Sequence, residues 1–256
     1  MTTDRPGSPG GGPEGEGEPG RDRSRKRRPL WQETLGVLVV AVGVAVLVKA
    51  LLLQAFYIPS ESMEPGLVRN DRILVEKVSY ELGGSPQRGD VVVFKDPGDW
   101  LPPQEAAGPT GTVPRLMEKV GLYPSGGHLV KRVIGVAGDA IHCCDGQGRI
   151  EVNGVALDEQ GYAQEDGAAC YGPMIGCDWF SGRVPAGHIF VMGDNRNHSA
   201  DSSFHICQGS ECTPGDQFVP VDLVVGKVFV LLWPFRHFTW LHRPDVFAQI
   251  PAPGTG

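Results

Sequence analysis

Basic residues are scarce over most of this 256-residue chain. Eight of its 23 lysines and arginines fall within the first 49 residues, so the remainder carries 15 basic against 24 acidic residues. Nucleic-acid binding draws its affinity from clustered lysine and arginine, which neutralise phosphate charge. The acidic remainder therefore argues against nucleic acid as a partner.

The sequence also lacks the C-x2-C pairs that are typical of zinc sites. All six cysteines lie beyond residue 142, and their even number favours disulfides in an oxidising compartment: Cys143, Cys144, Cys170, Cys177, Cys207 and Cys212. We expect Cys143 and Cys144 to bond to different partners, because a bridge between neighbours strains the peptide unit between them. The alternative is a metal site that combines these thiolates with His142 and His205; we expect no metal.

No amphipathic helix of three turns is evident after residue 60, and 36 glycines and 22 prolines interrupt the chain. Short apolar segments between them are typical of strands: residues 73–78, 91–94, 129–134, 150–155, 189–192 and 224–232. Asn153-Gly154 is a hairpin signal. We therefore predict a mainly β domain over residues 56–242, with one short helix near 113–120. We also predict a disulfide-bearing insertion at about 140–187 and a flexible tail over 243–256.

A single long apolar run stands near the N-terminus. Between residues 35 and 53 the one charge is Lys49, and 19 helical residues span roughly 28 Å, enough for a bilayer core. The basic cluster at 21–28 favours a cytoplasmic N-terminus. We predict a disordered cytoplasmic tail over 1–30, a single transmembrane helix over 31–55 anchoring the chain in the cell membrane, and an extracytoplasmic remainder. A cleaved secretory signal is the alternative, but Leu53 occupies a position that should be small.

A serine-rich turn follows this run directly, with the sequence IPSESMEP from Ile58. The chain has no G-x-S-x-G elbow and no S-x-x-K with a later K-T-G, so two common signatures of a serine nucleophile are absent. Pro59 and Pro65 favour a rigid turn, in which either Ser60 or Ser62 could attack a carbonyl while the other binds the oxyanion. The alternative is a polar turn without chemistry.

A candidate base lies inside an apolar segment. On a strand, Lys131 shares a face with Leu129 and Val133 while Arg132 points away. Such surroundings desolvate an ammonium ion and lower its pKa, which a lysine base requires. The alternative is a strand lysine whose head reaches solvent.

A third polar segment, GDNRNHSADS from Gly193, follows the strand predicted at 189–192. Ser199 could hydrogen-bond the neutral amine of Lys131 and orient it. We predict that Asp194, Arg196 and Asp201 brace this loop.

Together these segments resemble the type I signal peptidases, membrane-bound Ser-Lys endopeptidases that remove signal peptides from exported proteins. The segments PSESM, RGDVVVF from Arg88, KRVIGVAGD from Lys131 and GDNRNHSADS resemble four boxes of that family, in the same order. The resemblance implies an antiparallel β body resting on the lipid bilayer, preprotein signal peptides as partners, and no cofactor.

Carried over by position, the resemblance implies Ser62 as nucleophile and Lys131 as general base. Ser60 would donate to the oxyanion together with the Ser62 N–H, Ser199 would orient Lys131, and Asp201 would support it. The resemblance also implies that Ile58 lines a pocket for a small side chain of the substrate.

Three positions depart from the family pattern. Gly66 stands where threonine is usual, Ala137 where proline is usual, and Ser203 where arginine usually follows the last box. With no arginine at 203, we expect Asp201 either to find another partner, with Arg196 as a candidate, or to be held less firmly. Two alternatives stay open: a peptidase dedicated to one substrate, as in pilus or conjugation systems, and a non-enzymatic surface-binding β module.

Overall fold

The computed structural model describes residues 30–81, 83–106, 111–114, 126–164, 176, 178–207 and 212–253. The predicted basic tail up to residue 29 and the cysteines at 170 and 177 lie outside these residues. The chain divides into two compact units, Met1–Gly43 and Val44–Gly256, and every strand belongs to the second.

Helix α1 (Leu30–Leu52) covers most of the segment predicted as helix from the sequence. It ends three residues earlier than predicted, because Leu53–Tyr57 form strand β1 and pair antiparallel with β2 (Arg72–Glu76). Within the described part of the chain, no helix is both long enough and apolar enough to cross a membrane. The predicted transmembrane span is therefore not confirmed.

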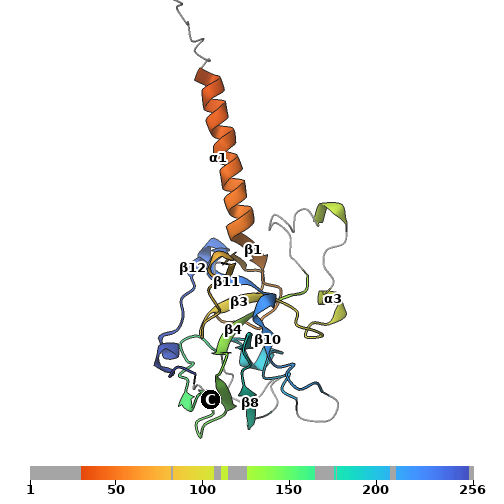
Figure 1. The fold of residues 1–256 in the computed structure, drawn as a ribbon, viewed down its shortest axis with the longest axis vertical. Helices are drawn as coiled ribbons and strands as arrows, with labels where there is room; N and C mark the ends of the chain where they lie inside the picture. Colours follow the sequence, from red (N-terminus) through yellow and green to blue (C-terminus); the bar gives the residue numbers. More distant parts are fainter. Residues whose placement is uncertain are drawn as a thin grey trace, which may run out of the picture. The chain divides into compact units, whose positions relative to one another are not determined.

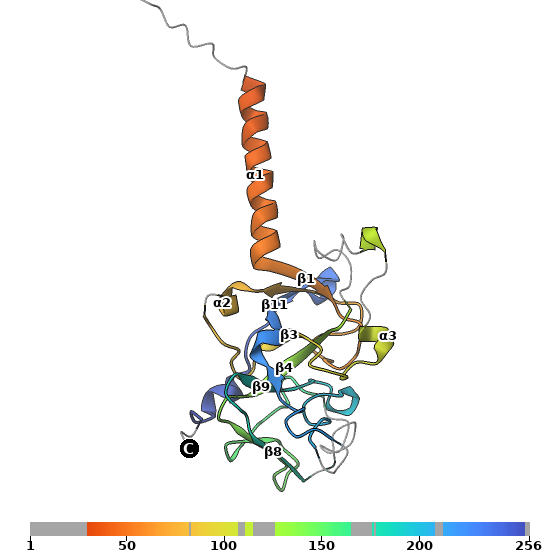
Figure 2. The same cartoon turned by 45° about the vertical axis from the view of Figure 1, so that its right-hand side comes forward.

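The main sheet has the strand order β1-β2-β11-β3-β4-β9-β10, and β12 pairs with β11 (Figures 1 and 2). Each of these pairs is antiparallel. The further strands are β3 (Val91–Lys95), β4 (His128–Val136), β9 (His188–Met192), β10 (Val219–Pro220), β11 (Val224–Trp233) and β12 (Thr239–Trp240). The predicted strands at 73–78, 91–94, 129–134, 189–192 and 224–232 are thus confirmed within a few residues.

A second, four-stranded sheet is formed by the predicted insertion, with the order β7-β6-β5-β8. Its strands are β5 (Ala140–Cys143), β6 (Glu151–Val152), β7 (Val155–Ala156) and β8 (Trp179–Arg183). Asn153 and Gly154 both have positive φ angles, 53° and 78°, as a two-residue hairpin turn requires. The hairpin predicted from Asn153-Gly154 is therefore confirmed.

The helical segments described after residue 60 are short. They are α2 (Val78–Glu81), α3 (Pro103–Ala106), η1 (Arg196–His198), η2 (Val221–Leu223), η3 (Phe235–His237) and η4 (Asp245–Gln249). The helix predicted near 113–120 is described only at its start, where residues 112–114 are helical. The mainly β architecture is confirmed.

Apolar side chains on the two faces of the main sheet enter different core clusters. On β3, Val91 and Val93 pack with Ile73 and Met63, whereas Val92 and Phe94 pack with Val133 and other residues on the opposite face. The central strand is buried on both faces, as its unbroken apolar sequence predicts. A third cluster fills the space between the two sheets, from Ile134, Phe190 and Met192 to Ile141, Val152 and Trp179.

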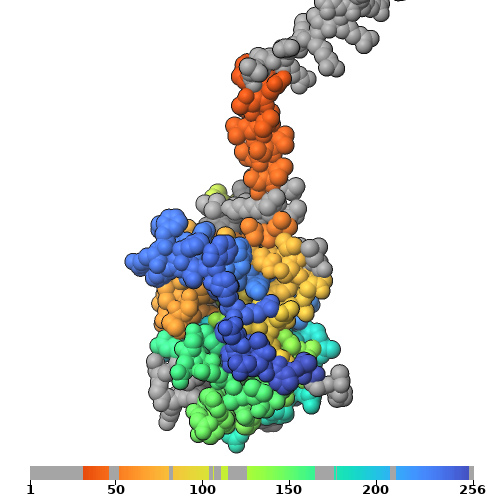
Figure 3. All heavy atoms as spheres, turned by 90° about the vertical axis from the view of Figure 1, so that its left-hand side faces the viewer, coloured from red at the N-terminus to blue at the C-terminus, as the bar shows by residue number. Residues whose placement is uncertain are grey.

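The C-terminal segment is packed against the β domain. Phe247 and Ile250 belong to the third core cluster, and Arg88 donates to the carbonyl oxygens of Ile250 and Pro251 at 3.3 and 3.0 Å. Figure 3 shows the darkest blue residues lying across the surface beside green residues of the insertion. The prediction of a flexible tail was wrong as far as residue 253, because η4 and the residue after it place two apolar anchors about one 3-10 turn apart.

The structure places two pairs of cysteines side by side. Cys143 lies against its neighbour Cys144, and the expectation that these two bond to different partners is not confirmed. Cys207 is joined to Cys212. Because Cys170 and Cys177 lie outside the described residues, disulfides across the insertion as a whole stay a prediction.

Candidate active site

The serine-rich turn predicted from the sequence is a closed loop between β1 and β2. Its two ends are tied by hydrogen bonds from Ile58 N to Asp71 O and from Asn70 N to Ile58 O, both 2.9 Å. The Asp71 carboxylate accepts from Val68 N at 2.8 Å. Met63 is fully buried in the core beside Ser62, so the loop is fixed at its ends and at its centre.

Ser62 and Lys131, which are 69 residues apart in sequence, are in direct contact in the structure. Lys131 Nζ lies 2.6 Å from Ser62 Oγ, and the two residues are only 4% and 7% exposed. Strand β4 places Lys131 opposite Val92 of β3, between the buried side chains of Leu129 and Val133. The structure therefore brings together the predicted nucleophile and the predicted base.

Burial lowers the pKa of Lys131 to about 8, because an ammonium ion loses its hydration in this environment. The carboxylates of Asp201 and Asp194 oppose this effect, since negative charge nearby favours the protonated lysine. Desolvation dominates. A substantial fraction of neutral amine is then present near pH 8, where an exposed lysine would be almost wholly protonated.

Ser60 lies at the entrance to this pair. Its hydroxyl oxygen is 3.3 Å from that of Ser62, and Ser60 is exposed whereas Ser62 is buried. A carbonyl group attacked by Ser62 would place its oxygen within reach of a hydroxyl in this position.

Gly193 begins the third polar segment and lies directly against the serine-rich turn between β1 and β2. A Cβ atom at this position would lie 2.4 Å from Ser62 O and 2.3 Å from Ser199 Oγ. Both distances are shorter than real Cβ contacts, so only glycine allows this approach. Asn195 adds two hydrogen bonds, from its backbone N to Ser62 O at 3.1 Å and from Nδ2 to Glu61 O at 3.2 Å.

Asp201 organises the segment that contains Ser199. One carboxylate oxygen accepts from Ser199 Oγ at 2.6 Å and from Gly193 N at 2.8 Å. The other accepts from the backbone N and the hydroxyl of Ser203, at 3.0 and 2.7 Å. Asp201 thus has another partner, as expected, but that partner is Ser203 and not the candidate Arg196.

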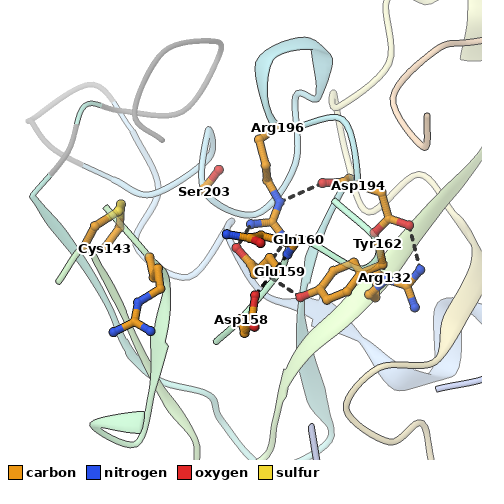
Figure 4. Close-up of polar contacts among 12 residues, drawn as sticks. Arg132, Cys143, Asp158, Glu159, Gln160, Tyr162, Asp194, Arg196 and Ser203 are labelled. Carbon is orange, nitrogen blue, oxygen red and sulfur yellow. Dashed lines mark hydrogen bonds and ion pairs between the residues drawn. A yellow bond between two sulfur atoms is a disulfide. The ribbon is translucent and has the colours of Figure 1, made fainter. Parts of the chain in front are cut away.

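Arg196 binds Glu159 instead, a residue of the insertion. Its two terminal nitrogens lie 2.5 and 2.7 Å from the Glu159 carboxylate, and its Nε donates to Gly193 O at 2.9 Å. Asp194 forms a bidentate ion pair with Arg132, at 2.7 and 2.6 Å (Figure 4). Arg132 does point away from the Lys131 side chain, as strand alternation predicts, but the interpretation of the sequence gave it no role.

Several residues of the site were missed from the sequence. Arg132 and Asn195 lie inside the recognised segments. A polar residue in a segment expected to be buried needs a hydrogen-bond partner, and this could have identified both of them. Glu159 and Tyr162 gave no signal, because they are separated from every recognised segment and reach the site only through the fold of the insertion.

The remaining predicted positions have modest roles in the geometry. Ile58 is buried in the core cluster that contains Met63, so its predicted role in a substrate pocket stays a prediction. A Cβ at Gly66 would meet Asp194 Oδ2 and Met63 O at an ordinary 3.8 Å, so a side chain is tolerated there. Ala137 is exposed in the turn between β4 and β5. Among the described residues, no group of three or more potential ligands is arranged to hold a metal ion.

The fold and the site together define a mainly β protein with a buried serine-lysine pair, supported by a carboxylate-rich loop. The chain belongs to the signal peptidase family, peptidase S26, whose family model matches residues 31–233.

Named relatives agree with this membership. The chain is 36% identical over 235 residues to a probable signal peptidase I of Mycobacterium leprae (strain TN), covering 84% of this chain and 80% of that protein. It is 35% identical over 236 residues to signal peptidase I of Mycobacterium tuberculosis (strain CDC 1551 / Oshkosh), covering 86% and 79%. A crystal structure of a signal peptidase I from Enterococcus faecalis V583 matches with a TM-score of 0.32 and 23% identity, over 56% of this chain and 95% of that one.

Proposed function

We propose that this protein is a serine endopeptidase that removes N-terminal signal peptides from exported preproteins, using Ser62 and Lys131. The observation that supports this proposal most strongly is the 2.6 Å contact between Lys131 Nζ and Ser62 Oγ inside a buried site. A turn without chemistry has no need to bury a lysine against a serine, because burying an unpaired ammonium ion is costly.

The reaction begins with neutral Lys131, which accepts the proton of Ser62 as Oγ attacks the carbonyl carbon of the scissile bond. The Ser60 hydroxyl and the Ser62 backbone N–H donate hydrogen bonds to the oxyanion that forms. The C–N bond then breaks, and the Lys131 ammonium group protonates the leaving amine. Water, deprotonated by Lys131, hydrolyses the acyl-enzyme and restores Ser62.

Ser199 has an orienting role in this proposal. Because its hydroxyl proton is donated to Asp201, its oxygen is free to accept a hydrogen bond. A neutral amine has two N–H donors and one lone pair. If one N–H donates to Ser199, the lone pair can be directed at the Ser62 hydroxyl.

We place the site at a cell membrane, with the N-terminus cytoplasmic and the β domain outside. The apolar run of α1 and the basic cluster before it support this topology. A group of exposed aromatic side chains also suits a membrane interface, where tryptophan is favoured: Trp233, Phe235, Phe238 and Trp240. Leu53 to Ser62 span at most about 30 Å, so an anchor at α1 would keep the nucleophile near the lipid surface.

The test uses the full chain reconstituted in lipid vesicles and a panel of preproteins with small residues before the cleavage site. We expect the wild type to float with the vesicles and to cleave several preproteins, and Ser62→Ala to float equally but cleave none. Normal cleavage by Ser62→Ala would refute the mechanism. Cleavage of one preprotein alone would favour a dedicated peptidase, and failure to float would refute the membrane location without affecting the chemistry.

A further inference from the structure

A buried ionic network joins the insertion to the loop that contains Ser199 (Figure 4). Glu159 lies in the insertion after β7 and binds both terminal nitrogens of Arg196, while Arg196 Nε binds Gly193 O. Both charged groups are withdrawn from water. Loss of either partner would leave the other uncompensated, so the pair is a strong constraint on where the loop can lie.

Tyr162 belongs to the same network and contacts both Glu159 and Arg132. Its hydroxyl donates to Glu159 Oε1 at 2.6 Å, and its ring lies 4.6 Å from the guanidinium carbon of Arg132. Arg132 in turn holds the Asp194 carboxylate through two hydrogen bonds. Tyr162 therefore touches both ion pairs and holds them in a fixed relation to each other.

The backbone of the insertion follows the same loop. Gln164 N donates to Asp194 O at 2.8 Å, and Arg196 N donates to Gln164 O at 3.3 Å. Residues 159–164 thus run beside residues 194–196 with both backbone and side-chain contacts. The loop is held on one side by the insertion and on the other by the serine-rich turn between β1 and β2.

The 193–203 loop contains Ser199 and is in direct contact with Ser62, so a displacement of the loop would displace these two serines as well. Gly193 lies directly against Ser62 O and Ser199 Oγ, and Asn195 N donates to Ser62 O. Arg196 fixes the carbonyl group of Gly193, and Asp201 fixes its N–H. A shift of Arg196 would therefore displace Gly193, which contacts both Ser62 and Ser199.

We propose that Glu159 and Tyr162 are positioning residues, through which the insertion fixes the 193–203 loop against Ser62 and Lys131. This inference rests on the proposed peptidase function. Neither residue touches the reacting atoms; Glu159 acts through Arg196 and Tyr162 through Glu159 and Arg132. The insertion is then a part of the active site and not an appendage to the β domain.

The experiment compares three variants of the full chain in a steady-state preprotein cleavage assay. Glu159→Gln removes the charge and keeps the shape, and we expect kcat to fall between about 10- and 100-fold with KM changed less than about 2-fold. Tyr162→Phe removes one hydroxyl group, and we expect a smaller loss of about 3- to 10-fold in kcat. Asp158→Asn is the matched control, because Asp158 is exposed beside Glu159, and it should keep wild-type kcat.

The pH dependence of kcat separates positioning from a general loss of stability. The charged groups that raise the pKa of Lys131 are the carboxylates of Asp201 and Asp194, and both belong to the 193–203 loop. A loosened loop would admit water to Lys131 and weaken the desolvation that lowers its pKa, so the midpoint for Glu159→Gln should move to higher pH. A purely structural role would lower the melting temperature and leave the midpoint and the kcat of the folded enzyme unchanged.

The outcomes are distinguishable. An inactive wild type would refute the proposed function itself. An active wild type with the same kcat and pH midpoint in Glu159→Gln as in Asp158→Asn would overturn only this inference. Should Glu159→Gln fail to fold, Tyr162→Phe decides: wild-type kcat in that variant overturns the proposal, and reduced kcat with a raised midpoint supports it.

Discussion

At the scale of single residues, Ser203 shows how a serine can hold a buried carboxylate. The family pattern led us to expect Asp201 to lack its usual arginine partner. The structure places the Ser203 backbone N and hydroxyl on one carboxylate oxygen, opposite Ser199 and Gly193 on the other. Four hydrogen bonds from uncharged donors therefore hold the Asp201 carboxylate.

Lys131 illustrates the conflict between stability and function. Its pKa is lowered to about 8 from the ordinary 10.5 by burial, so the folded state disfavours the protonated form. Between these two pH values the unfolded chain binds more protons than the folded one, and stability therefore rises with pH over that range. At pH 7 the buried ammonium group reduces stability.

We therefore expect Lys131→Met to abolish cleavage and to stabilise the fold. Removing the base should lower kcat by at least about 10³-fold. Replacing a buried ammonium group by an apolar side chain of similar length should raise the free energy of unfolding at pH 7 by about 1 kcal/mol, less at pH 10. Urea unfolding and a cleavage assay measure the two effects.

The matched control for this variant is Lys95→Met on the neighbouring strand β3, where the lysine is exposed. It should leave both activity and stability near wild type. Wild-type cleavage by Lys131→Met would contradict its role as base, and equal stability changes in the two variants would contradict the burial argument.

At the scale of elements, strand periodicity predicted the site better than loop chemistry did. Alternation along β4 placed Lys131 between Leu129 and Val133, and the structure confirms that all three are buried. By contrast, the roles of Glu159 and Tyr162 could not be predicted, since side-chain pairing across long separations depends on the fold. Strands β5, β10 and β12 were also missed, because two to four residues give too short a periodic signal. Strand β8 was missed as well.

The contribution of the C-terminal segment to stability was not predicted from the sequence. Phe247 is 6% exposed and packs beside Tyr162, with ring centroids 5.8 Å apart. We expect Phe247→Ala to lower the free energy of unfolding by about 3 kcal/mol, because it removes a buried aromatic side chain and leaves a cavity. Chemical denaturation measures this loss.

Phe235→Ala is the control for that prediction, since the Phe235 side chain is 72% exposed. A surface substitution of this kind should change the free energy of unfolding by no more than about 0.5 kcal/mol. A Phe247→Ala variant as stable as Phe235→Ala would show that the C-terminal segment does not stabilise the β domain.

At the scale of the whole molecule, the site draws residues from both the main sheet and the insertion. The main sheet provides Lys131 from β4, and the turn after β1 provides Ser62 itself. The insertion provides Glu159 and Tyr162, which hold the loop after β9. Composition and four short motifs predicted the family and the pairing of Ser62 with Lys131. The contacts of Glu159 and Tyr162 depend on the tertiary fold and could not be predicted from the sequence.

The measurement that tests the central claim most directly is the pH dependence of kcat/KM for preprotein cleavage, which reports the free enzyme. Cleavage requires Lys131 without its proton, so the rate should rise with pH and reach half its maximum near pH 8, where the buried amine loses its proton. A rising limb centred near the ordinary lysine pKa of about 10.4, or a rate independent of pH, would contradict a desolvated Lys131 as the base for Ser62.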